Sequence, residues 1–215
     1  MENAGEFLNH DPGMIRLLVA CFIVITIPIS AEPKTPEGIA IEILAPLLDP
    51  VKVATLKGDR PANSRLYKVL YWLETARRGG GDVSTVIDTA QRAAGYGGSS
   101  GAKADKQAIL WSRKNLESWG CFTPEGMEKL RNGGSPKITQ GQKAGDTIAL
   151  DHVLPFAVVP ELAARFYNLE AIPSKENLRK SAKITAREFT LAKRWNREGL
   201  LSAEGLEAVE SEQEK

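Results

Sequence analysis

The chain has 215 residues, a length that predicts one domain with room for a small helical extension. Hydrophobic residues make up 42% and charged residues 26%, proportions that are ordinary for a globular protein with a core. The formal net charge of +1 excludes any inference of nucleic-acid binding from overall charge alone. The charges are unevenly placed, because a basic segment at 175–197 is followed by an acidic tail at 203–215.

Residues 1–31 are predicted to be a signal peptide. The run 17–29 is almost entirely apolar, and it is followed by small residues that end at Ala31, where signal peptidase would cleave. This run is too short for a membrane-spanning helix, which needs about 20 apolar residues. Acidic residues precede Met14, so Met14 is an alternative start of the protein. An uncleaved membrane anchor and a lipoprotein signal at Cys21 remain open alternatives.

Cleavage after Ala31 predicts an exported protein, periplasmic or secreted, with no lasting membrane association. Cys121 would then be its only cysteine. Neither an intramolecular disulfide nor a cysteine zinc site could form in such a protein. We therefore expect Cys121 to be a buried core thiol rather than a catalytic one.

The following part, 32–135, is predicted to be a helical region. Thr123 and Pro124 are typical of an N-cap and a first helical residue, and the helix that they begin should end at Gly133. Three further helices are predicted where apolar residues recur at helical spacing and a loop follows: 64–78, 83–94 and 104–119.

The pattern changes after Pro136, where short strand-like segments replace long helical ones. Ser174 should cap a helix that continues through the basic segment toward Trp195. The fold class predicted is α+β, mainly helical, with a C-terminal strand–loop–strand–helix unit within 136–202. The strand-like segments are 138–140, 147–150 and 168–172.

Three separated elements of this unit carry a specific signal. Asp151-His152-Val153-Leu154-Pro155 ends a strand, Asn168-Leu169 opens the next, and Asn177 precedes Lys180-Ser181 in the helix. In this order they resemble the motif of the HNH endonucleases, whose ββα-metal fold reads Asp-His-x-x-Pro, then Asn-Leu, then Asn or His before Lys-Ser. The stretch 60–67 also resembles the helical region that precedes this motif in some bacterial members.

The resemblance implies roles for four residues. His152 would accept a proton from the water that attacks a phosphodiester. Asn168 would fix the loop that carries His152 and orient its ring. Asp151 and Asn177 would hold a divalent cation, Mg²⁺, Mn²⁺ or similar, because both are hard oxygen ligands and no thiolate is available.

The strand and helix geometry is compatible with these roles. Neighbouring residues of a strand point to opposite faces, so Asp151 and His152 can serve one site only where the strand ends. Asn177 falls in the first helical turn, where unpaired amides favour phosphate. Lys180, Arg179 and Lys183 are the candidate nucleic-acid contacts.

Two departures from the commonest family pattern affect the metal and the support of the site. Many members have histidine where this chain has Asn177, which leaves the identity of the metal open. The zinc-binding Cys-x-x-Cys pairs that brace some members are absent, so the helical region would have to brace the site.

The predicted function is that of an exported, metal-dependent HNH endonuclease that cuts DNA, with cleavage of RNA left open. A catalytically silent nucleic-acid-binding protein of the periplasm is the alternative. A periplasmic helical scaffold in which the motif is a coincidence is the third reading. The first is favoured because every expected catalytic position is filled.

Overall fold

The computed structural model describes residues 34–56, 60–180 and 183–213. The predicted signal peptide lies outside these residues. The chain from Pro33 onward forms one compact unit. Among the residues described, no helix has the length and apolar character needed to cross a membrane.

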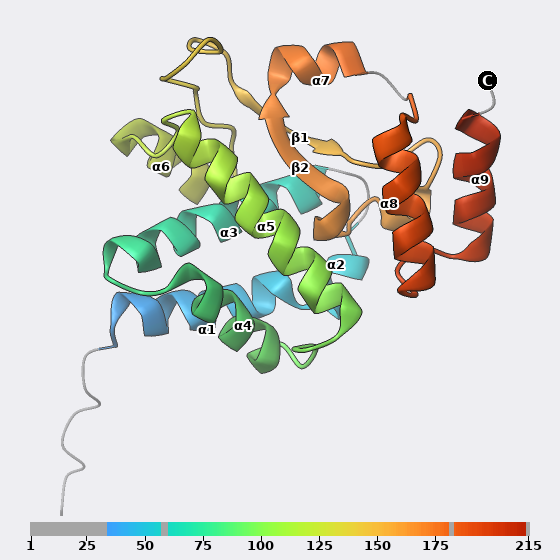
Figure 1. The fold of residues 1–215 in the computed structure, drawn as a ribbon. Coiled ribbons are helices and arrows are strands. Elements are labelled where there is room, and N and C mark those ends of the chain that lie inside the picture. Colours follow the sequence, from blue (N-terminus) through green and yellow to red (C-terminus); the bar gives the residue numbers. More distant parts are fainter. Residues whose placement is uncertain (1–33, 57–59, 181–182, 214–215) are drawn as a thin grey trace, which may run out of the picture. The chain divides into compact units, whose positions relative to one another are not determined.

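The described residues are mainly helical and contain a two-stranded antiparallel sheet, which confirms the α+β class (Figure 1). Two short 3₁₀ turns, η1 Pro160–Leu162 and η2 Phe166–Asn168, lie between the strands. The strands are β1 Ile148–His152 and β2 Leu169–Pro173. The helices are α1 Pro36–Leu48, α2 Pro50–Ala54, α3 Arg60–Arg78, α4 Val83–Ala93, α5 Ser100–Ser118, α6 Pro124–Arg131, α7 Ser174–Lys180, α8 Ala186–Arg197 and α9 Ala203–Gln213.

Side-chain caps explain where the helices begin. The predicted cap of α6 is confirmed, because Thr123 Oγ1 accepts the amide of Gly126 at 3.1 Å. The helix predicted at 104–119 begins four residues earlier, because Ser99 Oγ accepts the Ala102 amide at 3.0 Å. The helix predicted at 64–78 likewise starts earlier, as α3 begins at residue 60. The prediction for 83–94 agrees with α4 to within one residue.

The two strands pair in a register that sets Asp151 opposite Glu170 and His152 opposite Leu169. The strand predicted at 138–140 is wrong, since this stretch forms only an isolated bridge between Lys137 and Thr147. Its backbone bonds go elsewhere: the amides of residues 139 and 140 donate to the Trp119 carbonyl at the end of α5. The unpaired carbonyl at the end of α5 therefore accepts the amides that a partner strand would otherwise have bonded.

The single helix predicted from Ser174 toward Trp195 is also wrong, because the basic segment forms two helices. The first, α7, ends at Lys180, and α8 begins at Ala186 behind its own capping box. In that box the Thr185 hydroxyl accepts a backbone amide of the first helical turn, and the Glu188 carboxylate accepts the Thr185 amide. This pair is a strong local start signal. The predicted acidic tail is the helix α9, which packs against α8.

One hydrophobic core joins α1, α3, α4 and α5 to the sheet, and a second joins the β1–β2 loop to α8 and α9. Cys121 is buried in the first core as a free thiol, as expected. The second core contains Leu154, Leu162 and Trp195. The loop between the strands therefore packs its apolar side chains against α8 and α9.

Candidate active site

The hairpin and the helix after it bring the three motif segments together. Asp151 and His152 end β1, β2 runs antiparallel beside it, and α7 follows β2 without a linker (Figure 1). The helix α7 contacts both strands. The local arrangement is therefore strand, loop, strand and helix, in the order that the sequence predicts.

The imidazole of His152 is fixed by a backbone carbonyl. Its Nε2 lies 2.9 Å from the oxygen of Ala163, which can only accept a hydrogen bond, so Nε2 carries the proton. In the neutral ring Nδ1 is then unprotonated and able to accept a proton. The exposed ring of Phe156 lies beside His152, with 6.3 Å between the ring centroids.

Asn168 is fully buried and ties the loop after β1 together. Its Oδ1 accepts the Leu154 amide at 2.7 Å, and its Nδ2 donates to the Leu154 carbonyl at 3.1 Å. A longer contact of 3.4 Å joins Nδ2 to the carbonyl of Leu162. Because Ala163 follows Leu162, these bonds hold both the residues after His152 and the carbonyl that orients its ring.

The Asp151 carboxylate already faces a positive charge. Lys180 Nζ lies 2.8 Å from Asp151 Oδ2, 2.9 Å from the His152 carbonyl and 3.1 Å from Glu170 Oε1. Three oxygen atoms therefore surround one ammonium group. This is an environment of negative potential that favours a cation.

Glu170 is the second carboxylate of this group and is buried. Burial by itself would raise the pKa of the Glu170 carboxyl, but hydrogen bonds from Arg187 and the charge of Lys180 hold that pKa below its usual value. Arg187 binds both carboxylate oxygens, at 3.2 and 2.5 Å. The Glu170 carboxylate is thus ionised and forms ion pairs with both Lys180 and Arg187.

Asn177 lies on α7, three residues before Lys180, and residues at this spacing share one side of a helix. Its side chain is half-buried and forms no hydrogen bond with any other described residue. The first amides of α7 are already bonded: Ser174 N donates to the Thr147 carbonyl and Lys175 N to Asp146 Oδ2. The N-terminus of this helix is therefore less open to phosphate than the sequence suggested.

The other two candidate nucleic-acid contacts lie in solvent. Arg179 is exposed and donates to the carbonyl of Lys175 in its own helix. Lys183 is exposed just beyond the end of α7. Neither forms an ion pair within the described part of the chain, whereas Lys180 is fully engaged at Asp151.

The donor atoms present suit a hard divalent cation. The oxygen atoms of Asp151 and Asn177 are the ligand type that Mg²⁺ and Mn²⁺ prefer. Within residues 34–56, 60–180 and 183–213, no three His, Cys, Asp or Glu side chains are grouped as a metal site. A metal held here would take its remaining ligands from water and substrate.

Several residues of this region were not predicted from the sequence. Glu170 and Arg187 lie at the site through the strand register and the packing of α8, and Phe156 of the loop after β1 lies beside His152. An alternating strand pattern places Glu170 on one face of β2 without showing which residue of β1 lies opposite.

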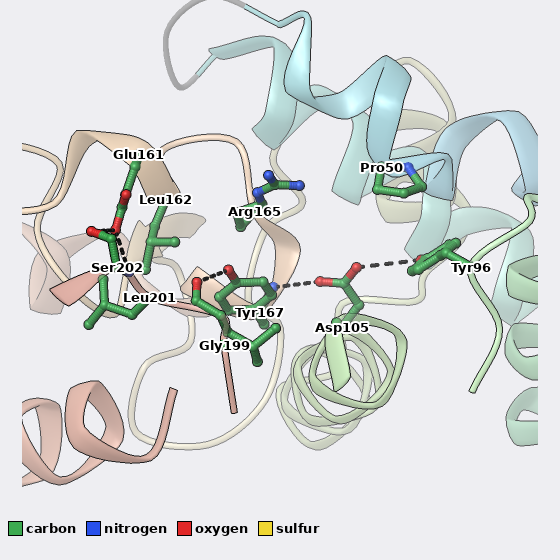
Figure 2. Close-up of a pocket in the computed structure, with 12 residues that line it drawn as sticks. Pro50, Tyr96, Asp105, Glu161, Leu162, Arg165, Tyr167, Gly199, Leu201 and Ser202 are labelled. Atoms are coloured by element: carbon green, nitrogen blue, oxygen red, sulfur yellow. Dashed lines mark hydrogen bonds between the residues drawn. The ribbon is translucent and has the colours of Figure 1, made fainter. Parts of the chain in front are cut away.

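A cavity of about 430 Å³ is lined by residues of α5, of the β1–β2 loop and of the segment between α8 and α9 (Figure 2). Asp105 is buried in its wall and accepts hydrogen bonds from the Tyr167 amide at 2.9 Å and the Tyr96 hydroxyl at 3.4 Å. Burial raises the pKa of the Asp105 carboxyl to about 7. Arg165 also lines this cavity, and its side chain forms no hydrogen bond or ion pair with the residues described.

When the chain is compared with models of protein families, with curated proteins and with solved structures, none of them matches it.

Proposed function

We propose that the chain is a metal-dependent endonuclease of the HNH type that hydrolyses phosphodiester bonds in DNA, with RNA as a second substrate. The observation that carries the proposal is the hydrogen bond from His152 Nε2 to Ala163 O, which leaves Nδ1 as a proton acceptor. This base lies at the end of the strand that carries Asp151, with α7 packed against the same strand.

The side chains support a division of labour. His152 accepts the proton of an attacking water molecule, and Asn168 holds the loop so that the ring keeps its orientation. Asp151 and Asn177 are the residues that would hold the divalent cation. When bound, such an ion supplies positive charge that stabilises the phosphate and the departing oxygen.

The activity is tested with purified mature protein, supercoiled plasmid and single-stranded DNA, with Mg²⁺ or with EDTA. Cleavage that requires Mg²⁺ or Mn²⁺ is the expected result. DNA binding without cleavage would instead support the silent nucleic-acid-binding protein. Full activity in EDTA would contradict the assignment of Asp151 and Asn177 as ligands.

Three variants separate the base from the ligands. His152→Ala should keep metal binding while turnover falls by about 10²–10⁴, the usual scale for loss of a general base. Asp151→Ala and Asn177→Ala should weaken metal binding itself, with activity partly recovered at high cation concentration. Calorimetric titration beside DNA cleavage measures both effects, and Asn132→Ala, at the end of α6, is the matched amide control.

We also propose that the protein is exported, periplasmic or secreted, on the basis of its residues 14–31. Expression in a bacterium should give a protein outside the cytoplasm that begins at Glu32. N-terminal sequencing decides this, and an intact Met1 on protein in the cytoplasm would contradict export.

A further inference from the structure

Glu170 is a buried carboxylate to which the proposed reaction assigns no role. It lies on β2 directly opposite Asp151 of β1, and its side chain is 8% exposed. A carboxylate at this place repels the negative charge of a phosphate substrate. Any favourable contribution of Glu170 to the site must therefore come through the cations that it binds.

Two cations from two helices bind the Glu170 carboxylate. Lys180, the last residue of α7, lies 3.1 Å from Oε1. Arg187, in the first turn of α8, binds Oε1 at 3.2 Å and Oε2 at 2.5 Å. Arg187 is in turn held by Glu188, at 3.4 Å. The carboxylate is thus fixed by α8 and keeps its place when Lys180 changes its other partners.

Lys180 uses all of its hydrogen-bond donors. An ammonium group has three N–H bonds. They are directed to Asp151 Oδ2 at 2.8 Å, to the His152 carbonyl at 2.9 Å and to Glu170 Oε1 at 3.1 Å. Of these three acceptors, only Asp151 is also a proposed ligand of the divalent cation. Lys180 therefore keeps two anchors and gains one free donor when Asp151 serves the cation.

The free donor would lie at the end of β1, bonded through the same ammonium to the backbone of His152. The side chains of Lys180 and Asp151 are 20% and 21% exposed, so this place is open to a substrate. A charged N–H donor forms strong hydrogen bonds with phosphate oxygens, and lysine is a usual phosphate-binding residue. Without an anchor, the same partial exposure would let the flexible lysine turn away into water.

We propose that Glu170 is a positioning residue for Lys180. Fixed by Arg187, it keeps the Lys180 ammonium at the strand end when Asp151 holds the divalent cation, so that the freed N–H donates to an oxygen of the substrate phosphate. Glu170 acts through Lys180 alone and contacts neither phosphate nor metal. The inference rests on the proposed nuclease function, and it assigns to Lys180 a contact with the nucleic-acid backbone, which carries no base identity.

The NMR signal of the Lys180 ammonium in ¹⁵N-labelled protein tests this anchoring without catalysis, at low temperature and without DNA. Its absence from Lys180→Met assigns the signal. A bonded ammonium exchanges its protons slowly enough to be observed, whereas a solvated one exchanges too fast. In the wild type, Mg²⁺ should shift the signal and leave it visible. In Glu170→Gln, Mg²⁺ should abolish it, because a neutral amide offers one acceptor oxygen to two cations.

A double-mutant cycle on turnover at saturating Mg²⁺ tests whether Glu170 acts through Lys180. Lys180→Met should lower turnover about tenfold, the scale of one charge-assisted hydrogen bond, and Glu170→Gln about fivefold. The double variant should be no slower than Lys180→Met alone, because Glu170 then has no lysine to hold.

Glu74→Gln is the matched control for a buried carboxylate. Glu74 is 1% exposed and pairs with arginines of α3 and α5, Arg77, Arg78 and Arg113, away from the strand end. Its substitution should lower thermal stability and leave both turnover and the Lys180 signal unchanged. Circular dichroism confirms that each variant is folded at the temperature of the assay.

Three results overturn the inference: a Lys180 signal that Mg²⁺ leaves unchanged in the wild type, a signal still visible with Mg²⁺ in Glu170→Gln, or losses that multiply in the double variant. Failure of the proposed function gives a different result. The expected NMR changes without cleavage of any DNA keep the anchoring of Lys180 by Glu170 and reject the nuclease. Mg²⁺-dependent cleavage that is unaffected by Glu170→Gln keeps the nuclease and rejects the inference.

Discussion

Lys180 is a cation held against the carboxylate that we assign to the divalent metal. Its ammonium lies 2.8 Å from Asp151 Oδ2 and is also anchored by Glu170. Two cations repel strongly at such distances, so a bound metal ion must weaken or displace the ion pair between Lys180 and Asp151. We therefore expect Lys180 to lower the affinity of Asp151 for metal in the free protein.

Lys180→Met removes this charge and keeps a side chain of similar length. Mg²⁺ or Mn²⁺ should then bind roughly fivefold more tightly, because a partly exposed ion pair contributes about 1 kcal/mol. Calorimetric titration measures the affinity, and Lys175→Met, an exposed lysine of the same helix, is the control. Unchanged or weaker metal binding in Lys180→Met would show that Lys180 does not compete with the ion.

Asp105 gives the second prediction for a single residue. Burial raises the pKa of its carboxyl to about 7 from the ordinary value of 3.8. The folded protein therefore binds this proton more tightly than the unfolded chain does. The protonated Asp105 carboxyl therefore contributes fully to the free energy of unfolding below about pH 4, and this contribution is lost as the pH rises toward 7. The change is on the order of 4 kcal/mol.

Asp105→Asn keeps the acceptor for the Tyr167 amide and removes the titration. The difference in free energy of unfolding between wild type and variant should therefore shift against the wild type as the pH rises from about 4 to about 7. Urea unfolding at a series of pH values measures both proteins. Parallel stability curves would contradict a raised pKa for Asp105.

At the scale of elements, the loop between β1 and β2 is organised by a buried amide rather than by regular structure. Asn168 bonds both backbone groups of Leu154 and approaches the carbonyl of Leu162. The adjacent carbonyl, that of Ala163, orients the His152 ring. Stability of the loop and orientation of the proposed base therefore depend on the same side chain.

Asn168→Ala should lower the free energy of unfolding by about 3 kcal/mol, because it leaves buried backbone groups without partners. It should also lower turnover at temperatures where the variant is fully folded. Asn196→Ala is the control, since its amide also donates to two backbone carbonyls, at the start of α9 and away from the site. Equal effects of the two substitutions on turnover would exclude a positioning role for Asn168.

The elements also show where local sequence signals compete. The prediction of a single basic helix followed the start signal at Ser174 and missed a second one, the capping box of Thr185 and Glu188. The strand predicted at 138–140 had a suitable pattern but no partner strand, and its amides bond the end of α5 instead. Caps are readable from neighbouring residues, whereas strand pairing depends on distant ones.

At the scale of the whole molecule, the helices hold both edges of the sheet. Tyr67 of α3 donates to the Ile148 carbonyl of β1 at 3.0 Å. On the other edge, Asn115 of α5 donates to the Ala171 carbonyl of β2, and Ser112 accepts the Ala171 amide. The expectation that the helical region braces the hairpin thus has a specific structural basis.

We predict that residues 136–202 do not fold alone. A two-stranded hairpin is marginally stable in water, and here its edge bonds and much of its core come from α3 and α5. Circular dichroism and NMR of the fragment should show an unfolded chain, while residues 33–215 should give a dispersed spectrum. A folded fragment would show that the unit is independent of the helical region.

The sequence by itself determined the helical character of the chain, the bounds of α4 and α6 to within two residues, and the order of the motif segments. These features depend on residues close together in the chain: caps, glycine stops and apolar spacing. The strand-end positions of Asp151 and His152 followed from the same local signals, whereas Asn168, expected to open the second strand, lies in the 3₁₀ turn η2 just before β2.

Only the tertiary structure decided which groups meet at the strand end. Asp151 and Glu170 meet at Lys180, and the Ala163 carbonyl orients His152; these contacts join segments that are distant in sequence. Such contacts depend on strand register and helix packing, which are set by the burial of whole faces and not by any short pattern.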